Sequence, residues 1–205
     1  MNAKEYVRKY FIMGSQNCSR NPIHILHEAL EAGITAFQYR EKGAGALTGR
    51  EKVELGKSLR QLCARYDIPF FMNDDVELAI KLEADGIHVG QQDTPVADIR
   101  ANYPHLQIGL SISNVKELQQ SPLELVDYVG VGPIFPTTTK EDAKEAVTTK
   151  WVTYVRHKHP NMAIVGIGGI TTENATEVIR AGADGVAVIS TITNAKDIAQ
   201  TVKKL

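Results

Sequence analysis

Four short polar clusters lie where apolar, strand-like runs of the sequence end, and their residue types suit a charged phosphate ligand. The clusters are Gln38–Gly43, Asn73–Asp75, Gly90–Asp93 and Pro136–Lys140. Together they offer two carboxylates for a metal, three cations, and several hydroxyl and amide groups. Carboxylates with water and phosphate oxygens form the shell that Mg²⁺ prefers, and cations stabilise phosphate charge. The clusters therefore predict a site for a magnesium-bound diphosphate.

The first cluster combines two cations with an amide. Gln38, Arg40 and Lys42 alternate along the chain, so their side chains should point the same way at a strand end. The guanidinium and the ammonium could bind phosphate oxygens, and the amide can donate and accept at once, as recognition of a heterocycle requires. The alternative is a salt bridge between Arg40 and Glu41 at the rim of the fold.

The second and third clusters supply acidic residues. Asp75 directly precedes a helical pattern and is interpreted as the N-cap of that helix. Asp74 then remains available, and Asp93 follows the adjacent strand, so two carboxylates from neighbouring strand ends could share one cation. Magnesium commonly takes one or two protein carboxylates together with water and substrate phosphate oxygens.

The C-terminal half of the sequence adds donors for further oxygens. Threonines 137–139 precede Lys140 in a loop that follows an apolar run, and would bring hydroxyls and an ammonium to a ligand. The stretches Gly166–Ile170 and Val188–Ser190 occupy the positions where barrels commonly bind a monophosphate. Tight turns would also explain the glycines of the first stretch.

The elements that must position these clusters follow a repeated rhythm. An amphipathic segment runs directly into a strand-like stretch at residues 32–37, 84–89 and 181–188. Eight strands and eight helices are expected, which fits either an open doubly wound sheet or a closed barrel. Because polar clusters follow so many different strands, we predict an α/β fold, a single (β/α)8 TIM barrel over residues 1–205, with residues 1–9 as a short N-terminal helix. Helices are expected at Leu47–Tyr66, Val76–Glu83, Val115–Gln120 and Lys144–His157, among others.

Composition limits the classes of partner. The 205 residues carry a net charge of -1 and are 43% hydrophobic, as expected of one folded domain without a basic face for nucleic acid. No apolar run reaches the roughly 18 residues of a membrane span, and the N-terminus lacks a secretory signal. A cytoplasmic protein that binds neither nucleic acid nor membrane is therefore expected.

In the order in which they occur, the clusters closely resemble the thiamine-phosphate synthase family, from about residue 10 onward. The motifs are Gln38–Lys42, Asn73–Asp75, Asp85–Asp93, Gly132–Lys140, Ile167–Ile170 and Val188–Ser190. The resemblance implies a magnesium-dependent transferase of thiamine biosynthesis. Such an enzyme condenses 4-amino-2-methyl-5-(diphosphooxymethyl)pyrimidine with 4-methyl-5-(2-phosphooxyethyl)thiazole, giving thiamine phosphate and pyrophosphate by a dissociative mechanism.

The resemblance also assigns roles to individual positions. It places the pyrimidine against Gln38 and Ser111. It places the diphosphate against Arg40, Lys42, Asn73 and Lys140, of which Arg40 and Lys140 would be catalytic. It gives Mg²⁺ to Asp74 and Asp93. It places the thiazole against Thr137 and Thr139, and the thiazole phosphate against Gly169, Ile189 and Ser190.

Two other functions remain alternatives. A thiazole tautomerase-type enzyme needs acid and base groups, but it generally lacks the acidic pair and the Thr–Lys loop. A non-catalytic barrel that binds thiamine phosphate would have no use for a magnesium–diphosphate site. A homo-oligomer is left open, and His88 could be either a hydrogen-bonded core residue or a ligand.

Overall fold

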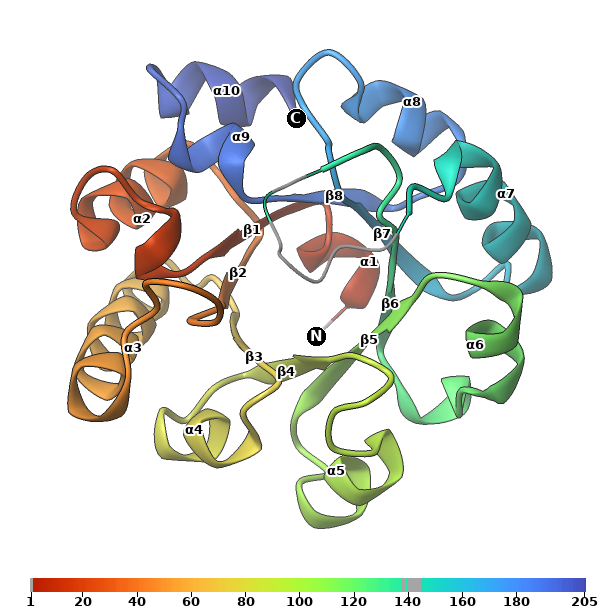
Figure 1. Ribbon diagram of the computed structural model, residues 1–205, viewed down its shortest axis with the longest axis horizontal. Helices are drawn as coiled ribbons and strands as arrows, with labels where there is room; N and C mark the ends of the chain where they lie inside the picture. Colours follow the sequence, from red (N-terminus) through yellow and green to blue (C-terminus); the bar gives the residue numbers. More distant parts are fainter. Residues whose placement is uncertain (1, 138, 140–144) are drawn as a thin grey trace.

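Eight parallel strands close into a barrel, and the helices surround it (Figure 1). The computed structural model describes residues 2–137, 139 and 145–205. Neighbouring strands follow the order of the sequence, and β1 pairs with β8 to close the ring. This closure confirms the predicted (β/α)8 barrel and rules out the open sheet. The strands are β1 (Lys9–Met13), β2 (Ala36–Tyr39), β3 (Phe70–Asn73), β4 (Gly86–Val89), β5 (Gln107–Ile112), β6 (Tyr128–Val131), β7 (Ala163–Ile167) and β8 (Gly185–Val188).

The helices alternate with the strands, and five of them, α1, α2, α4, α6 and α10, begin at a residue whose side chain caps the helix. Asp75 accepts a hydrogen bond from the N–H of Leu78 at 3.0 Å, which confirms it as the N-cap of α4. Asn114 and Asp197 cap α6 and α10 in the same way. The helices are α1 (Ala3–Tyr6), α2 (Pro22–Glu31), α3 (Gly49–Arg65), α4 (Val76–Lys81), α5 (Val96–Asn102), α6 (Val115–Gln120), α7 (Thr148–Lys158), α8 (Ala175–Arg180), α9 (Ser190–Thr193) and α10 (Ile198–Lys204), with short 3₁₀ turns at Ser15–Asn17 and Leu123–Leu125.

Helix α7 begins later than its sequence pattern predicts. The pattern suggested a helix from Lys144, which lies outside the described residues, but residues 145–147 are not helical. The backbone N–H groups of Val147 and Thr148 instead donate to the carbonyls of Pro133 and Ile134. These bonds tie the segment to the chain that leaves β6, so the helix starts only at Thr148.

The core consists of two shells separated by the wall of the barrel. The outer shell lies between strands and helices and holds most of the aliphatic residues. The inner shell fills the barrel and includes three tyrosines, Tyr6, Tyr10 and Tyr128, together with Phe71. Tyr6 belongs to α1, which is visible inside the ring of strands in Figure 1. Its ring packs against Phe71 and Tyr128, with centroid distances of 5.3 and 5.8 Å, so α1 fills one end of the barrel.

The end of the barrel at which the strands begin is held by a repeated clamp. In each clamp, an aspartate just before an even-numbered strand accepts a hydrogen bond from an N–H of the preceding strand. An arginine from the helix that leads into this odd-numbered strand pairs with the same aspartate. The three pairs are Arg60–Asp85, Arg100–Asp127 and Arg156–Asp184, and the three N–H donors are Phe70, Ile108 and Ile164.

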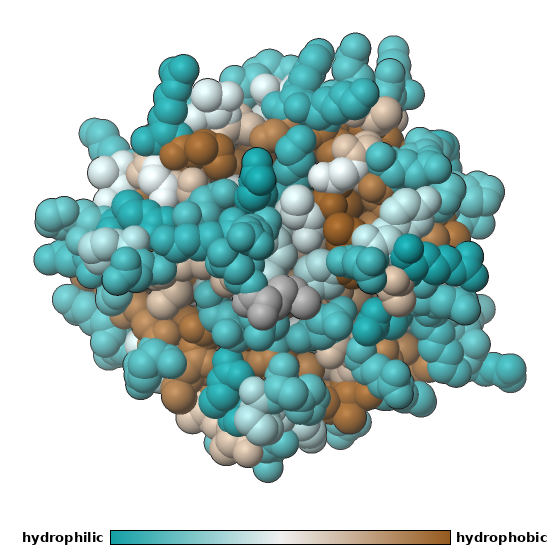
Figure 2. Space-filling model, turned by 180° about the vertical axis from the view of Figure 1, so that it is seen from behind, coloured by the Kyte–Doolittle hydropathy of each residue, from teal (hydrophilic) through white to brown (hydrophobic). Residues whose placement is uncertain are grey.

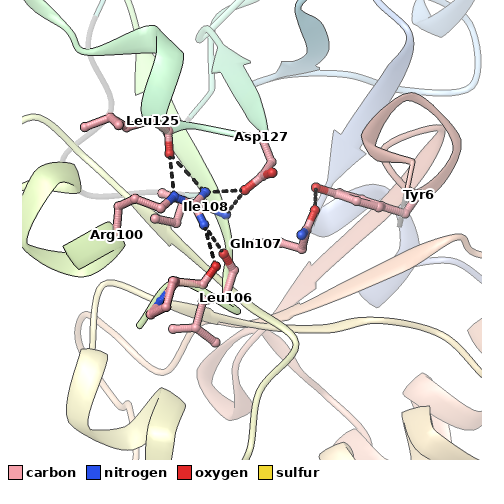
Figure 3. A network of polar contacts seen from close by, with 8 residues as sticks. Tyr6, Arg100, Leu106, Gln107, Ile108, Leu125 and Asp127 are labelled. Carbon is pink, nitrogen blue, oxygen red and sulfur yellow. Dashed lines mark hydrogen bonds and ion pairs between the residues drawn. The ribbon is translucent and has the colours of Figure 1, made fainter. Parts of the chain in front are cut away.

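Figure 3 shows the second clamp. The guanidinium of Arg100 lies 2.7 Å from Asp127 and donates to the carbonyls of Leu106 and Leu125. At the remaining strand pair, Thr35 replaces the aspartate: its hydroxyl accepts from the N–H of Lys9 and donates to the carbonyl of Tyr6. The barrel is therefore fastened at four corresponding positions.

Asp127→Ala should destabilise the fold by about 2–3 kcal/mol. The change leaves the N–H of Ile108 and part of the Arg100 guanidinium without their charged acceptor. Urea unfolding would measure this loss. Asp98→Ala, at an exposed position in the first turn of α5, should stay within about 1 kcal/mol of the unaltered chain. Equal stability of the two variants would contradict a stabilising clamp.

The outer surface is mostly polar. Figure 2 shows the face opposite to that of Figure 1, where hydrophilic residues predominate and hydrophobic ones lie in separate patches. Four large hydrophobic side chains in the described part of the chain are exposed, each on a different helix: Ile80, Val115, Tyr154 and Ile179. Within the described ranges, no helix combines the length and the apolar character that crossing a bilayer requires.

Candidate active site

A cavity of about 860 Å³ opens where the strands end, and it gathers residues that are far apart in the sequence. Eight of the residues predicted for the site line it: Lys42, Asp93, Ser111, Thr137, Thr139, Gly169, Ile189 and Ser190. Three others are buried and do not line it: Gln38, Arg40 and Asn73. Lys140 lies outside the described residues. The carboxyl ends of the strands of a barrel are where its active sites are found.

Asp74 and Asp93 come together beside this cavity. The ammonium of Lys42 lies 2.6 Å from a carboxylate oxygen of Asp74. Burial raises the pKa of Asp93; the N–H of Gly90, which donates to its carboxylate at 2.6 Å, opposes the shift, and the neighbouring Asp74 adds to it. Two close carboxylates with a lysine beside one of them form an acidic pair that a cation would stabilise.

The backbone helps to aim Asp74. This residue adopts a left-handed conformation with φ of 61°, which aspartate tolerates better than most residues do. Its N–H donates to the carbonyl of His88 at 2.9 Å, which fastens the end of β3 to β4. The next residue, Asp75, caps α4 and pairs with Lys52 at 2.8 Å. Asp74 and Asp75 therefore have different partners, and Asp75 is the helix cap that the sequence analysis predicted.

Glu41 holds the loops around the first cluster. Its carboxylate accepts hydrogen bonds from the N–H groups of Ser15 and Leu47, at 2.9 and 2.7 Å, and from the hydroxyl of Ser15. The side-chain amide of Gln16 donates to the backbone carbonyls of Arg40 and Lys42. The loop after β1 therefore supports the segment that carries the two cations.

A hydrogen-bonded set of side chains lies inside the barrel next to the cavity. The imidazole of His88 is hydrogen-bonded to the hydroxyl of Ser111 at 2.8 Å and to that of Tyr128 at 3.1 Å. Tyr128 in turn contacts the hydroxyl of Tyr10 at 2.8 Å, and Gln38 donates to Tyr10 at 3.1 Å. The two residues predicted to face a pyrimidine are thus connected through Tyr10 and Tyr128, for which the sequence analysis assigned no role, and through His88, which it left open as a core residue or a ligand.

The opposite part of the rim carries hydroxyl groups. Thr139 and Ser190 lie with their hydroxyl oxygens 3.3 Å apart, and both line the cavity. Gly169 has a positive φ of 63°, and a Cβ there would lie 2.6 Å from the carbonyl oxygen of Pro136. This glycine is therefore required by its backbone conformation and by the close approach of the loop after β6, whether or not it also faces a phosphate.

The charged residues in the described lining of the cavity do not favour an anion by themselves. They comprise one cation, Lys42, and two carboxylates, Asp93 and Glu117. Adding the buried Arg40 and the nearby Asp74 gives two cations and three carboxylates, an excess of one negative charge in either count. A phosphate ligand here would need additional positive charge.

The sequence matches a family described as thiamine monophosphate synthase over residues 9–192. This span contains all eight strands and every residue predicted for the site. The chain belongs to the thiamine monophosphate synthase family. Similarity to individual proteins extends beyond the span that defines the family.

Two bacterial proteins and one solved structure illustrate the likeness. The chain is 59% identical to the thiamine-phosphate synthase of Oceanobacillus iheyensis over 98% of each protein. It is 50% identical to that of Bacillus mycoides over 96% of this chain and 90% of the relative. The structure of thiamine phosphate pyrophosphorylase from Pyrococcus furiosus superposes with a TM-score of 0.87 at 34% identity, covering 100% of this chain and 96% of that one.

Within this thiamine monophosphate synthase barrel, the sequence analysis missed several residues next to the site. The sequence analysis assigned no role to Tyr10 or Tyr128, although alternation along their strands could have placed both side chains inside the barrel. Gln91 was noted only as part of its cluster, yet its amide donates to the carbonyl of Ser111 at 2.9 Å. Glu117 lines the cavity and accepts from the N–H of Ser113 at 2.7 Å, a capping pattern that its spacing from Asn114 could have indicated.

Proposed function

We propose that this protein forms thiamine phosphate from 4-amino-2-methyl-5-(diphosphooxymethyl)pyrimidine and 4-methyl-5-(2-phosphooxyethyl)thiazole. Family membership supports thiamine phosphate synthesis, and the residue roles proposed below are those that the resemblance to the family implies. The bond from the pyrimidine methylene carbon to the diphosphate oxygen breaks, and pyrophosphate leaves with the electron pair. The thiazole nitrogen then donates its lone pair to the same carbon.

The observation that carries this proposal is that the two sides of the cavity rim differ in their chemistry. The arc formed by β2, β3 and β4 bears Lys42 and the acidic pair, whereas the arc formed by β6, β7 and β8 bears Thr139 and Ser190. A cavity of about 860 Å³ falls in the size range that encloses small organic ligands. Two substrates with phosphate groups at opposite ends therefore fit the arrangement.

The residues around the acidic pair suit the diphosphate. Lys42 could move from Asp74 to the phosphate oxygens, and Arg40, at the end of β2, would bind them as a planar fork. Asn73 ends β3 directly before Asp74 and would donate from its amide. Gln38 and Ser111 would hold the pyrimidine ring. From its place in the sequence after Thr139, Lys140 is proposed as a further cation at the leaving group.

The donor set beside Lys42 fits magnesium. Asp74 and Asp93 provide hard carboxylate oxygens from neighbouring strands, and the local excess of negative charge would be offset by a divalent cation. When bound, Mg²⁺ would supply positive charge at the diphosphate and so favour its departure. Asp93 is held toward this place by the N–H of Gly90, and Asp74 by its backbone bond to His88.

The thiazole side requires binding rather than proton transfer. The thiazole nitrogen attacks with its own lone pair and carries no proton, so no general base is needed for the step. Thr137 and Thr139 would line the ring, while Gly169, Ile189 and Ser190 would hold its phosphate through backbone N–H and hydroxyl groups. Positioning the nitrogen near the methylene carbon then accounts for much of the rate.

The direct test is to incubate the purified protein with both substrates, with and without Mg²⁺, and to quantify the products by chromatography. Thiamine phosphate and pyrophosphate should appear in equal amounts, and chelation of the metal should suppress both. Isomerisation of a thiazole carboxylate phosphate, or tight binding of thiamine phosphate without turnover, would overturn the proposal. The cytoplasmic location stays a prediction from the sequence, and a homo-oligomer stays open.

Ser190→Ala should weaken binding of the thiazole phosphate by about tenfold and leave binding of the pyrimidine diphosphate unchanged. The variant removes one hydroxyl donor to a charged group; such a bond contributes about 1.5–3 kcal/mol, and the lower end of this range corresponds to about tenfold. Calorimetric titration with each substrate would measure both effects. Gly169→Val is a less selective variant, because its side chain would push against the carbonyl of Pro136 and disturb the threonine loop. Equal weakening of both ligands by Ser190→Ala would contradict a local phosphate site.

A further inference from the structure

A continuous chain of hydrogen bonds crosses the interior of the barrel and joins the two residues that are proposed to hold the pyrimidine. It runs from Gln38 on β2 to Ser111 on β5, and its intermediate members come from β1, β6 and β4: Tyr10, Tyr128 and His88. The four donor–acceptor distances, from the Gln38 end to the Ser111 end, are 3.1, 2.8, 3.1 and 2.8 Å. All four lie within the usual range for hydrogen bonds.

The first link sets a direction. The Nε2 of Gln38 can only donate, so the hydroxyl oxygen of Tyr10 is the acceptor. Tyr10 has one proton, and its contact with the hydroxyl of Tyr128 provides an acceptor for it. The single proton of Tyr128 is then available to Nδ1 of His88. Each phenol thus accepts one bond and donates one.

Burial maintains this alternation. Tyr10 and Tyr128 are 1% and 0% exposed. Desolvation raises the pKa of each phenol above its ordinary value, so both keep their protons throughout the physiological range. A buried hydroxyl proton without an acceptor is unfavourable, so each must be directed at a neighbour.

The direction fixes the tautomer of the histidine. Nδ1 of His88 accepts from Tyr128, so in the neutral ring the proton resides on Nε2. Nε2 then donates to the hydroxyl oxygen of Ser111 at 2.8 Å. Since the Ser111 hydroxyl oxygen accepts this bond, its own proton is not directed at His88. The hydroxyl can therefore donate a hydrogen bond to another atom. Ser111 lines the cavity, so a ligand can receive this proton.

Two glycines reserve the space that the rings occupy. A Cβ at Gly109 would lie 2.1 Å from the Tyr128 ring and 2.5 Å from Nδ1 of His88. A Cβ at Gly130 would lie 2.9 Å from Cε1 of His88. Glycine inside a strand weakens it, and often marks a close approach of another group. The positions of the two rings are therefore built into β5 and β6.

We propose that Tyr10, Tyr128 and His88 are positioning residues that orient the Ser111 hydroxyl as a hydrogen-bond donor to the ligand. The complementary ligand atom is an acceptor without a proton, such as a pyrimidine ring nitrogen or a phosphate oxygen. The identity of this ligand rests on the proposed function, whereas the orientation of the chain does not. The histidine acts here through Ser111 and transfers no proton in the reaction.

Nuclear magnetic resonance of the imidazole nitrogens tests the orientation directly in the free protein. At mildly alkaline pH, where histidine side chains are generally neutral, His88 should be in the Nε2–H form. Because the chain has six histidines, its signals are identified by their loss in His88→Asn. Tyr128→Phe should convert His88 to a mixture of tautomers, since Nδ1 loses its donor.

Tyr6→Phe is the matched control for this substitution. Tyr6 belongs to the same aromatic cluster, with its ring 5.8 Å from that of Tyr128, but its hydroxyl bonds to Gln107 and lies outside the chain of hydrogen bonds. Both variants keep an aromatic ring in place, so the barrel should remain packed. Tyr6→Phe should leave the tautomer of His88 and the turnover rate unchanged.

A double-mutant cycle tests whether the chain acts through Ser111. Tyr128→Phe alone should lower kcat/KM by about tenfold, the effect of about one hydrogen bond. In the Ser111→Ala background, the same substitution should change kcat/KM by less than about twofold. A merely structural role for Tyr128 would give the same reduction in both backgrounds.

The outcomes separate this inference from the proposed function. A neutral His88 found in the Nδ1–H form, or multiplicative effects in the cycle, would overturn the inference even in an active enzyme. Failure to form thiamine phosphate while His88 stays in the Nε2–H form would instead overturn the proposed function. If Tyr128→Phe does not fold, as shown by the loss of its cooperative urea transition, Tyr10→Phe takes its place in the cycle. The same coupling to Ser111 is expected for Tyr10→Phe.

Discussion

Asp74→Asn and Asp93→Asn should each lower the turnover of the two substrates by about a hundredfold, and added Mg²⁺ should restore only part of it. Each substitution keeps the size of the side chain but removes a negative charge from the pair beside Lys42. An amide is a poorer ligand than a carboxylate for a hard cation, so affinity for the metal falls. A lost electrostatic contact to the departing diphosphate commonly reduces the rate by that amount. Initial rates measured over a range of magnesium concentrations provide the check.

Asp75→Asn is a closely matched control for these variants. Asp75 is adjacent in sequence and also pairs with a lysine, Lys52, but its carboxylate caps α4. Asparagine caps helices about as well as aspartate, so stability and activity should be nearly retained. Full activity of both Asp74→Asn and Asp93→Asn, with an unchanged response to Mg²⁺, would eliminate the acidic pair as the metal site.

Lys140→Ala should slow the chemical step by a hundredfold or more while weakening binding of the pyrimidine diphosphate much less. The prediction comes from the sequence, because Lys140 lies outside the described residues. The described residues around the cavity carry an excess of carboxylates, and Lys42 already contacts Asp74. Charge that builds on departing pyrophosphate therefore requires another cation, and a contact that strengthens in the transition state affects mainly turnover.

Single-turnover formation of thiamine phosphate at saturating substrate concentrations measures this effect. Lys140→Arg should recover only part of the rate, since a planar fork does not replace a compact ammonium. Lys150→Ala, at an exposed position on α7, should behave as the unaltered protein does. A normal single-turnover rate for Lys140→Ala with only a raised half-saturation concentration would assign the lysine to substrate anchoring alone.

The barrel was predictable because its determinants are local in the sequence. Alternating helical and strand-like periods identified the eight repeats, and the cap at Asp75 marked the start of α4 to the residue. The approach of Asp74 to Asp93 followed as well, since parallel strand ends meet at the same end of a barrel. The predicted start of α7 was wrong because backbone hydrogen bonds to the carbonyls of Pro133 and Ile134 compete with helix formation there. The periodicity of the sequence does not indicate such hydrogen bonds.

The interior chain of hydrogen bonds could not be predicted in the same way. Tyr10 and Tyr128 are 118 positions apart, and the contact of their hydroxyls depends on barrel closure and on strand register. The glycines at positions 109 and 130 looked like ordinary strand residues, although their missing side chains make room for His88 and Tyr128. Sequence patterns show which face a residue occupies, but not which partner reaches it across the barrel.

The clamps at the end of the barrel where the strands begin have a consequence for how the chain can fold. Each arginine lies only 25, 27 or 28 positions before its aspartate, and each clamp joins a helix and two successive strands. The barrel is thus a succession of four quarter-barrels, the first held by Thr35, and each can fasten itself before its neighbours exist. Because contacts of short sequence separation form quickly, we expect the slowest step of folding to be the docking of β1 against β8, which joins the first quarter to the last.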